Sequence, residues 1–124
     1  MAWTYWIVIG SVLAGLSVVV GAFGAHGLRE RLTPEMLQIY EIGARYQMYH
    51  ALALLAVGLI QIKIDHPMLN VAGWCFVVGI VIFSGSLYAL SVTGQRWLGM
   101  ITPIGGLVFI LGWAALAYSA LRPN

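Results

Sequence analysis

The 124-residue sequence contains very little charge. Six residues are Lys or Arg and four are Asp or Glu, which together make 8% of the chain. A soluble domain usually carries about 25% charged residues, so this chain has too few to cover its surface with hydrated groups. Because 61% of the residues are hydrophobic, the composition predicts a protein that lies in a lipid bilayer.

Cysteine and basic residues are too scarce for several other classes of protein. The single cysteine, Cys75, excludes an intramolecular disulfide and a cysteine-rich metal site. Six basic residues do not make the positive surface that nucleic-acid binding requires, so we expect no nucleic-acid partner. The sequence has no HExxH zinc motif and no serine suitably spaced from a base. We therefore expect no catalytic residue, metal or cofactor, and a protein that is not an enzyme.

Long uncharged runs make up most of the chain. Windows without Asp, Glu, Lys or Arg cover residues 1–28, 46–62, 66–95 and 97–121. All but the second exceed the roughly 18 residues typical of a spanning helix, and such runs lack the alternation of barrel strands. They predict an all-α integral membrane protein, a single domain over residues 1–124 that forms an up-down-up-down four-helix bundle. The expected helices cover residues 3–25, 34–62, 69–91 and 98–121.

The second predicted helix is longer than the others. An unbroken helix over residues 34–62 would rise more than about 40 Å, against about 30 Å for the hydrocarbon core of a bilayer. Its start is well marked, because Thr33 suits the capping position and Pro34 suits the first helical position. We therefore expect the first part of this helix to lie at the membrane interface.

The first turns of this helix are amphipathic. A polar stripe at helical spacing consists of Glu35, Gln38, Glu41 and Arg45. Glu41 and Arg45 stand at positions i and i+4, which predicts an ion pair between them. The segment is expected to turn into the membrane with a bend near Gly43.

Alternating helices would bring most of the polar blocks to one end of the bundle. We call this end side B; it contains the end of the first helix, the start of the second, the end of the third and the start of the fourth. The opposite end, side A, receives three of the ten charges: Lys63, Asp65 and Arg122. Side B receives the other seven: Arg29, Glu30, Arg31, Glu35, Glu41, Arg45 and Arg96. Because Lys and Arg favour the cytoplasmic side, we expect loops 26–33 and 92–97 to be cytoplasmic, in the inner (plasma) membrane.

Polar residues of side B are the candidates for a binding site. His50 leads them, because an ionisable group in the apolar part of a membrane helix is costly and tends to mark a site. Arg45 has the guanidinium that pairs with an anionic group. The residues expected to bind a ligand, lipid or partner are His26, Glu41, Arg45, Tyr46, Tyr49, His50, Ser84, Ser86, Tyr88 and Thr102.

Small residues have a simpler interpretation as packing positions. Ser17, Gly21 and Ala25 recur at four-residue steps, which lets membrane helices approach closely. The expected packing set is Ser17, Gly21, Ala25, Gly85, Gly105 and Gly106. Two of the polar candidates also have a structural interpretation. His26 suits the end of a helix, and Arg45 suits an anchor at the membrane interface. A haem held by His26 and His50 is disfavoured, because no second motif supports it.

Several short blocks together resemble one family of small membrane proteins. The blocks are Gly21-Ala-Phe-Gly-Ala-His26, Tyr46-Gln-Met-Tyr-His50-Ala-Leu-Ala-Leu-Leu55, Phe83-Ser-Gly-Ser-Leu-Tyr88, Thr102-Pro-Ile-Gly-Gly106 and Gly112-Trp113. In this order, across nearly the whole chain, they resemble the YgdD/YwdK family. The resemblance implies a four-span inner-membrane protein and implies no activity, because the family is a domain of unknown function.

Two classes of function fit this pattern. The first is a non-enzymatic component that binds a lipid, a small ligand or a partner through side B, with membrane lipids, a homo-oligomer or another membrane protein as partners. The alternative is a transporter or channel for protons or a small solute, lined by Tyr46, His50, Ser84 and Thr102. Four helices leave little room for a pore in one copy, so the alternative would require an oligomer.

Overall fold

A computed structural model describes residues 1–122, which fold into helices joined by short connections. The last two residues of the predicted domain lie outside this part of the chain. No strand occurs within residues 1–122. The elements in order are α1 (Ala2–Phe23), the π-helical turn η1 (Gly24–Leu28), α2 (Pro34–Gln61), α3 (Pro67–Gly79), the π-helical turn η2 (Ile80–Ser84), α4 (Gly85–Thr93), the 3-10 turn η3 (Arg96–Met100) and α5 (Thr102–Leu121).

The ends of these helices follow from local sequence signals. The Thr33 hydroxyl accepts a hydrogen bond from the backbone N–H of Met36 at 3.2 Å, which confirms the predicted cap of α2. His66 caps α3 in the same manner, accepting from the N–H of Met68 at 3.0 Å. That histidine cap explains why the helix begins at Pro67, two residues before the expected start.

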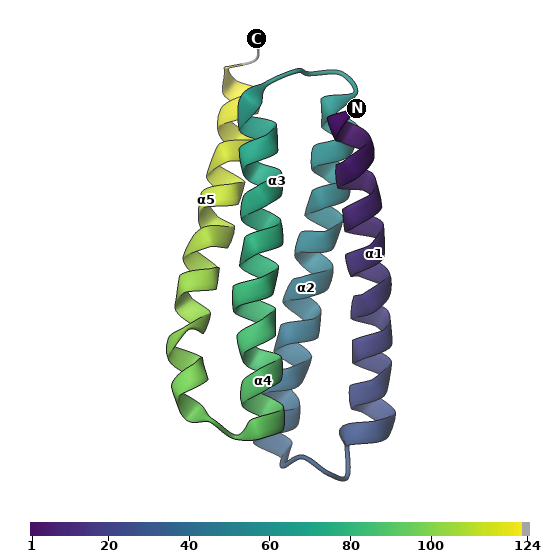
Figure 1. The fold of residues 1–124 in the computed structure, drawn as a ribbon, viewed down its shortest axis with the longest axis vertical. Helices are drawn as coiled ribbons and strands as arrows, with labels where there is room; N and C mark the ends of the chain where they lie inside the picture. Colours follow the sequence, from purple (N-terminus) through teal and green to yellow (C-terminus); the bar gives the residue numbers. More distant parts are fainter. Residues whose placement is uncertain (123–124) are drawn as a thin grey trace.

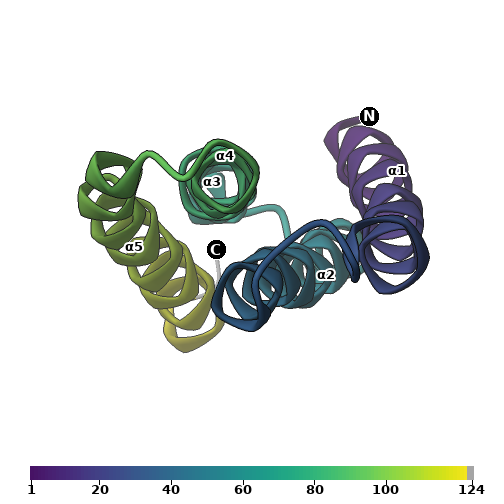
Figure 2. The ribbon, with the colours of Figure 1, turned by 90° about the horizontal axis from the view of Figure 1, so that it is seen from below.

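The helices lie side by side, and their connections alternate between the two ends of the molecule (Figure 1). The η1–α2 and α4–η3 connections share one end, which is side B, while the α2–α3 loop and both chain ends lie at side A. Viewed from below, α2 and the α3–α4 rod occupy the middle, with α1 and α5 at opposite flanks (Figure 2). α1 packs mainly on α2, and α5 packs mainly on α3 and η2.

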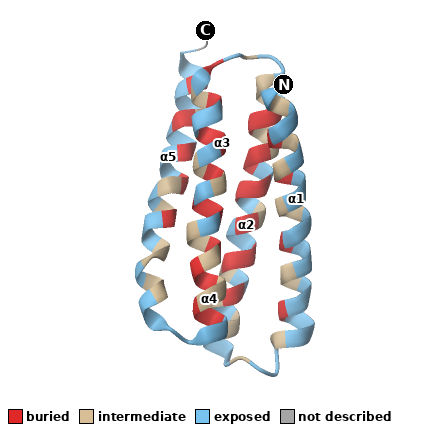
Figure 3. Ribbon diagram, viewed as in Figure 1, coloured by how far each residue is buried: buried red, intermediate tan, exposed pale blue. Residues whose placement is uncertain are grey.

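The buried residues concentrate on the two middle helices, whereas the outward faces of α1 and α5 are exposed (Figure 3). Fully buried side chains include Leu54 and Val57 on α2 and Leu69 and Phe76 on α3. Large apolar side chains cover the outward surfaces, and three helical stretches are long and apolar enough to cross a membrane. These stretches are Ala2–Leu28, Pro67–Thr93 and Arg96–Leu121.

α2 is the long helix that does not meet this standard, and two expectations for its first half are wrong. The α-helix is unbroken at Gly43, where we expected a bend. The glycine instead lets an aromatic ring approach, since a Cβ at Gly43 would lie 2.8 Å from Cε1 of Tyr88. Glu41 and Arg45 do not form their expected ion pair. Within residues 1–122 the only ion pair joins Arg96 and Glu35, at 3.5 Å.

The contact between α1 and α2 repeats every seven residues rather than every four. Gly10, Ser17 and Gly24 are buried along it, and a Cβ at Gly10 would lie 2.8 Å from the carbonyl oxygen of Ala51. A four-residue step turns about 40° past a full turn, so the predicted stripe leaves the contact face. Accordingly, a Cβ at Gly21 would meet nothing within 4 Å, and Ala25 is exposed.

The remaining predicted packing residues lie in different surroundings. Gly105 is buried against η2, where an added Cβ would lie 2.5 Å from the backbone nitrogen of Phe83. A Cβ at the neighbouring Gly106 would meet only the Phe83 ring, at 3.8 Å. A Cβ at Gly85 would meet nothing within 4 Å. Gly105 is therefore the glycine on which the close approach of α5 to η2 depends.

We expect Gly105→Ala to destabilise the protein while Gly106→Ala does not. The added methyl group at residue 105 would force backbone apart, and such overpacking typically costs about 1–3 kcal/mol. At residue 106 the methyl group would make an ordinary contact. Unfolding by sodium dodecyl sulfate in mixed micelles, followed by circular dichroism, measures both variants; equal stabilities would contradict the packing described here.

Candidate functional site

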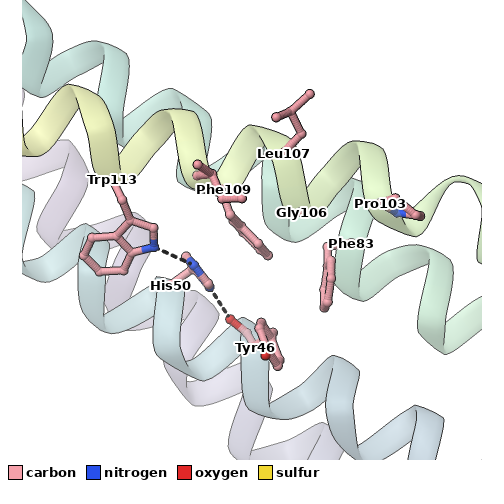
Figure 4. Close-up of a pocket in the computed structure, with 9 residues that line it drawn as sticks. Tyr46, His50, Phe83, Pro103, Gly106, Leu107, Phe109 and Trp113 are labelled. Carbon is pink, nitrogen blue, oxygen red and sulfur yellow. Dashed lines mark hydrogen bonds between the residues drawn. The ribbon is translucent and has the colours of Figure 1, made fainter.

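His50 is hydrogen-bonded through both ring nitrogens (Figure 4). Its Nδ1 lies 2.8 Å from the carbonyl oxygen of Tyr46, and the indole N–H of Trp113 donates to its Nε2 at 3.1 Å. A carbonyl oxygen only accepts and an indole N–H only donates. The hydrogen of His50 therefore lies on Nδ1, and the side chain is a neutral imidazole that joins α2 to α5.

Aromatic rings enclose this histidine. Its ring stacks on Phe109 with centroids 3.5 Å apart and planes 6° apart, and Phe76 and Trp113 lie at 5.6 Å and 5.7 Å. Only 5% of His50 is exposed. With both nitrogens bonded and the ring stacked, His50 has no lone pair left for a metal, a haem or a mobile proton.

The other histidine of side B lies apart from this cluster. His26 is exposed in η1, at the end of α1, whereas His50 is buried about four helical turns into α2. No group of three or more His, Cys, Asp or Glu residues in the described part of the chain could hold a metal ion. The geometry offers no pair of axial ligands for a haem.

Side-chain hydrogen bonds also join α1 to α2. Polar side chains, which find no water in the core of a bilayer, donate to backbone carbonyl groups of the facing helix. The bonds run from Ser17 to Ala44 (2.7 Å), from Tyr40 to Val20 (2.7 Å) and from Gln47 to Leu13 (2.9 Å). They fix the level of α1 relative to α2.

Four predicted binding residues take part in similar bonds around η2 and α4. The Ser84 hydroxyl donates to the carbonyl of Gly43 at 2.7 Å. The Tyr88 hydroxyl donates to Oε1 of Gln47 at 2.6 Å, and the hydroxyls of Ser86 and Thr102 lie 2.6 Å apart. Buried polar groups need such partners, and here the chain supplies them. The structure thus brings Ser84, Ser86, Tyr88 and Thr102 into helix contacts rather than into an open site.

The other predicted residues lie on or near the outward face of α2. Glu41, Arg45 and Tyr49 are exposed, and Tyr49 packs against Tyr46 with ring centroids 5.5 Å apart. Tyr46 also contacts Phe83, at 4.8 Å between centroids. Tyr46 therefore stands between the outward face of α2 and the space beside His50.

A groove of about 500 Å³ opens between α2 and α5 beside the pair formed by His50 and Trp113 (Figure 4). Its walls are almost entirely apolar. It is lined by Tyr46, His50, Phe83, Pro103, Gly106, Leu107, Phe109, Ile110 and Trp113. The groove owes part of its width to Gly106, whose missing side chain leaves the Phe83 ring as the nearest wall.

The sequence did not predict most of the groove. Of its lining residues, only Tyr46 and His50 were predicted to bind a ligand. Phe109 was not named, and Trp113 appeared only in the Gly112-Trp113 block of the family resemblance, although their i and i+4 positions place both on one face of α5. Apolar and aromatic residues are ordinary in a spanning helix, so that spacing was the signal that could have joined the two residues to one site.

Side-chain hydrogen bonds also join the helices at side A, where the sequence places only three of the ten charges. Asn70 accepts hydrogen bonds from the indole N–H of Trp6 at 2.9 Å and from the amide of Gln61 at 2.8 Å. Trp6 meets Trp74 edge to face, with centroids 5.3 Å apart. These contacts tie α1 to α2 and α3, and they line a second apolar groove of about 390 Å³ between α1 and α3.

Comparison with known proteins identifies relatives of similar length. Residues 20–106 match the family described as "Protein of unknown function (DUF423)". A UPF0382 membrane protein of Staphylococcus epidermidis (strain ATCC 12228 / FDA PCI 1200) is 48% identical over 116 residues, covering 94% of both chains. The UPF0382 membrane protein YwdK of Bacillus subtilis (strain 168) is 44% identical over 117 residues, covering 94% of this chain and 95% of YwdK. No solved structure matches the chain.

Trp113→Phe should destabilise the protein because it leaves Nε2 of His50 buried without a donor. An unsatisfied buried acceptor costs about 1–3 kcal/mol. Trp74→Phe is the control, since Trp74 is 59% exposed. Unfolding in mixed micelles measures both variants, and ¹⁵N NMR of His50 reports the ring hydrogen. A signal with the hydrogen on Nε2 would contradict the assignment.

Proposed function

Because the chain belongs to the DUF423 family, a family of unknown function whose relatives are named as membrane proteins, we propose that it binds a lipid of its own membrane. The binding site is the groove between α2 and α5, and the ligand is the hydrocarbon chain of that lipid. The observation that carries this proposal is a groove with almost entirely apolar walls, in which the side chains of His50 and Trp113 are hydrogen-bonded to one another.

The arrangement of the helices supports a site inside the bilayer. We propose that all four helices cross the membrane in up-down-up-down order, with the first turn of α2 at the interface of side B. α2 then crosses between the three apolar stretches, and the groove faces lipid along α5. Ile110 and Leu107 at its rim are 63% and 58% exposed, as expected of side chains that contact lipid.

The dimensions and chemistry of the groove favour a hydrocarbon chain over a polar ligand. Its volume of about 500 Å³ falls within the roughly 300–1,000 Å³ of typical ligand sites. Phe83, Phe109 and Trp113 give it rigid aromatic walls, and no charged side chain lines it. The protein therefore acts as a non-enzymatic binding component.

Transport by the polar residues of side B has less support. Ser84 and Thr102 are hydrogen-bonded within the bundle, and both ring nitrogens of His50 are occupied. A path for protons or a solute needs polar groups that face a water-filled space. These groups face helix contacts, so we place transport second to lipid binding.

Gly106→Leu tests the lipid site by filling the groove. The new side chain would occupy the space next to the Phe83 ring, so we expect retained lipid to fall sharply. Native mass spectrometry of protein incubated with phosphatidylethanolamine and phosphatidylglycerol, then released from detergent, measures retention. Gly15→Leu is the matched control, because a Cβ at Gly15 meets nothing within 4 Å and lies on α1. Equal lipid retention in the two variants would refute the groove as the site.

We also propose that side B is cytoplasmic and that the chain resides in the inner (plasma) membrane. Side B holds Arg29, Arg31, Arg45 and Arg96 against Lys63 and Arg122 on side A, and positive residues favour the cytoplasmic side. A reporter fused after residue 124 should then be outside the cytoplasm. Alkaline phosphatase at that position should be active and green fluorescent protein dark; the reverse pattern would overturn the orientation.

A further inference from the structure

The outward face of α2 carries two charges at the depth of the bilayer interior. The hydrogen bond from Ser17 to the carbonyl of Ala44 places Arg45 level with the second half of α1. That level lies about 22 Å from Ala2 and about 16 Å from Leu28 at 1.5 Å per residue. The bond from Tyr40 to Val20 places Glu41 about one turn closer to side B. Both charges therefore lie within a hydrocarbon core of about 30 Å, with Glu41 nearer than Arg45 to the boundary on side B.

The surface around these charges is apolar at the same depth. On α1, Val18 and Val19 are 60% and 63% exposed. On η2, Val81 is 67% exposed, one turn from the serine that bonds the Gly43 carbonyl of α2. The membrane cannot be shifted to leave Arg45 in water without also leaving these valines in water. The polar face of α2 thus requires a cover that lipid chains do not provide.

Neither charge finds a partner within the described chain. Glu41 and Arg45 make no hydrogen bond or ion pair among residues 1–122. Charged residues inside membranes almost always pair or face protein. A protein surface that contributes both an acid and a base would satisfy this pair of charges together.

The same face of α2 has the residue spacing of a helix–helix interface. Positions recur at alternating steps of four and three residues, the pattern that packs two helices along a seam. Tyr49, Leu52 and Leu59 on this seam are 52%, 52% and 57% exposed. The seam consists of Gln38, Ile42, Arg45, Tyr49, Leu52, Ala56 and Leu59. It runs the length of the one long helix that is not apolar enough to cross a membrane alone.

We propose that this seam of α2 binds the same seam of a second copy of the chain, about a two-fold axis along the membrane normal. Two copies in one membrane then place their α2 helices in parallel. Helical side chains point toward the N-terminus of their helix, so Arg45 reaches toward Glu41 of the partner subunit. The two-fold axis repeats the contact, and one interface pairs all four charges.

This interface is distinct from the lipid groove. Tyr46 separates the seam from the groove, and no seam residue lines the groove. The dimer would therefore persist in the Gly106→Leu variant whether or not lipid binds. Failure of the lipid proposal leaves this proposal standing.

Cysteine cross-linking tests the seam directly in native membranes. In a Cys75→Ser background, Leu52→Cys should form a disulfide dimer on treatment with copper phenanthroline, because residue 52 would face its own copy. Val19→Cys on α1 and Ile110→Cys on α5 are the controls; each is 63% exposed and lies off the seam. Dimer in all three variants, or in none, would overturn the proposal.

Charge exchange tests the pairing between copies. Arg45→Glu and Glu41→Arg should each lower cross-linking at Leu52→Cys several-fold, and the double exchange should restore it. Circular dichroism checks that each variant folds. If one of the single-exchange variants does not fold, the cross-linking result of Leu52→Cys with native charges decides whether the dimer exists. If Arg45 instead binds an anionic headgroup, both variants that carry Arg45→Glu would lose phosphatidylglycerol in native mass spectrometry. The double exchange would then not restore cross-linking, which would refute the proposal.

Discussion

The structure depends on the lack of hydrogen-bond partners in a lipid bilayer. A buried polar group needs a partner inside the protein, and several polar side chains of this bundle find theirs across helix contacts. Ser17 and Gln47 join α1 to α2, Ser84 joins η2 to α2, and Trp113 joins α5 to His50. The polar residues of side B therefore set the level and spacing of the helices.

α2 is the element on which these contacts converge. Its inner faces accept hydrogen bonds from α1 and η2, while His50 accepts the indole N–H of α5. The proposed functions lie on its other two surfaces, the groove shared with α5 and the outward seam. The charges Glu41 and Arg45 lie on the outward face of α2, which these contacts leave uncovered.

The helices could be predicted because apolar runs and capping residues are local signals; Thr33 and Pro34 mark the start of α2 within the sequence itself. The contacts between helices could not. The expected stripe of Ser17, Gly21 and Ala25 was wrong at two of its three residues, since the side of α1 that meets α2 depends on a partner far away in the chain. His50 and Tyr46, which line the groove, were among the predicted binding residues, but Phe109 looks like any other apolar residue of a spanning helix and Trp113 was not predicted to bind a ligand.

The sequence alone determined the solvent, the helical class and the family, because these depend on composition, uninterrupted apolar runs and short blocks of residues. Only the tertiary structure decided which polar residues form hydrogen bonds between helices. Ser84, Ser86, Tyr88 and Thr102 attracted attention as polar groups in an apolar chain, yet their hydrogen bonds are satisfied by neighbouring helices. A hydroxyl group is available to a ligand only if no other helix uses it, and that depends on the distance and facing of helices that no local pattern encodes.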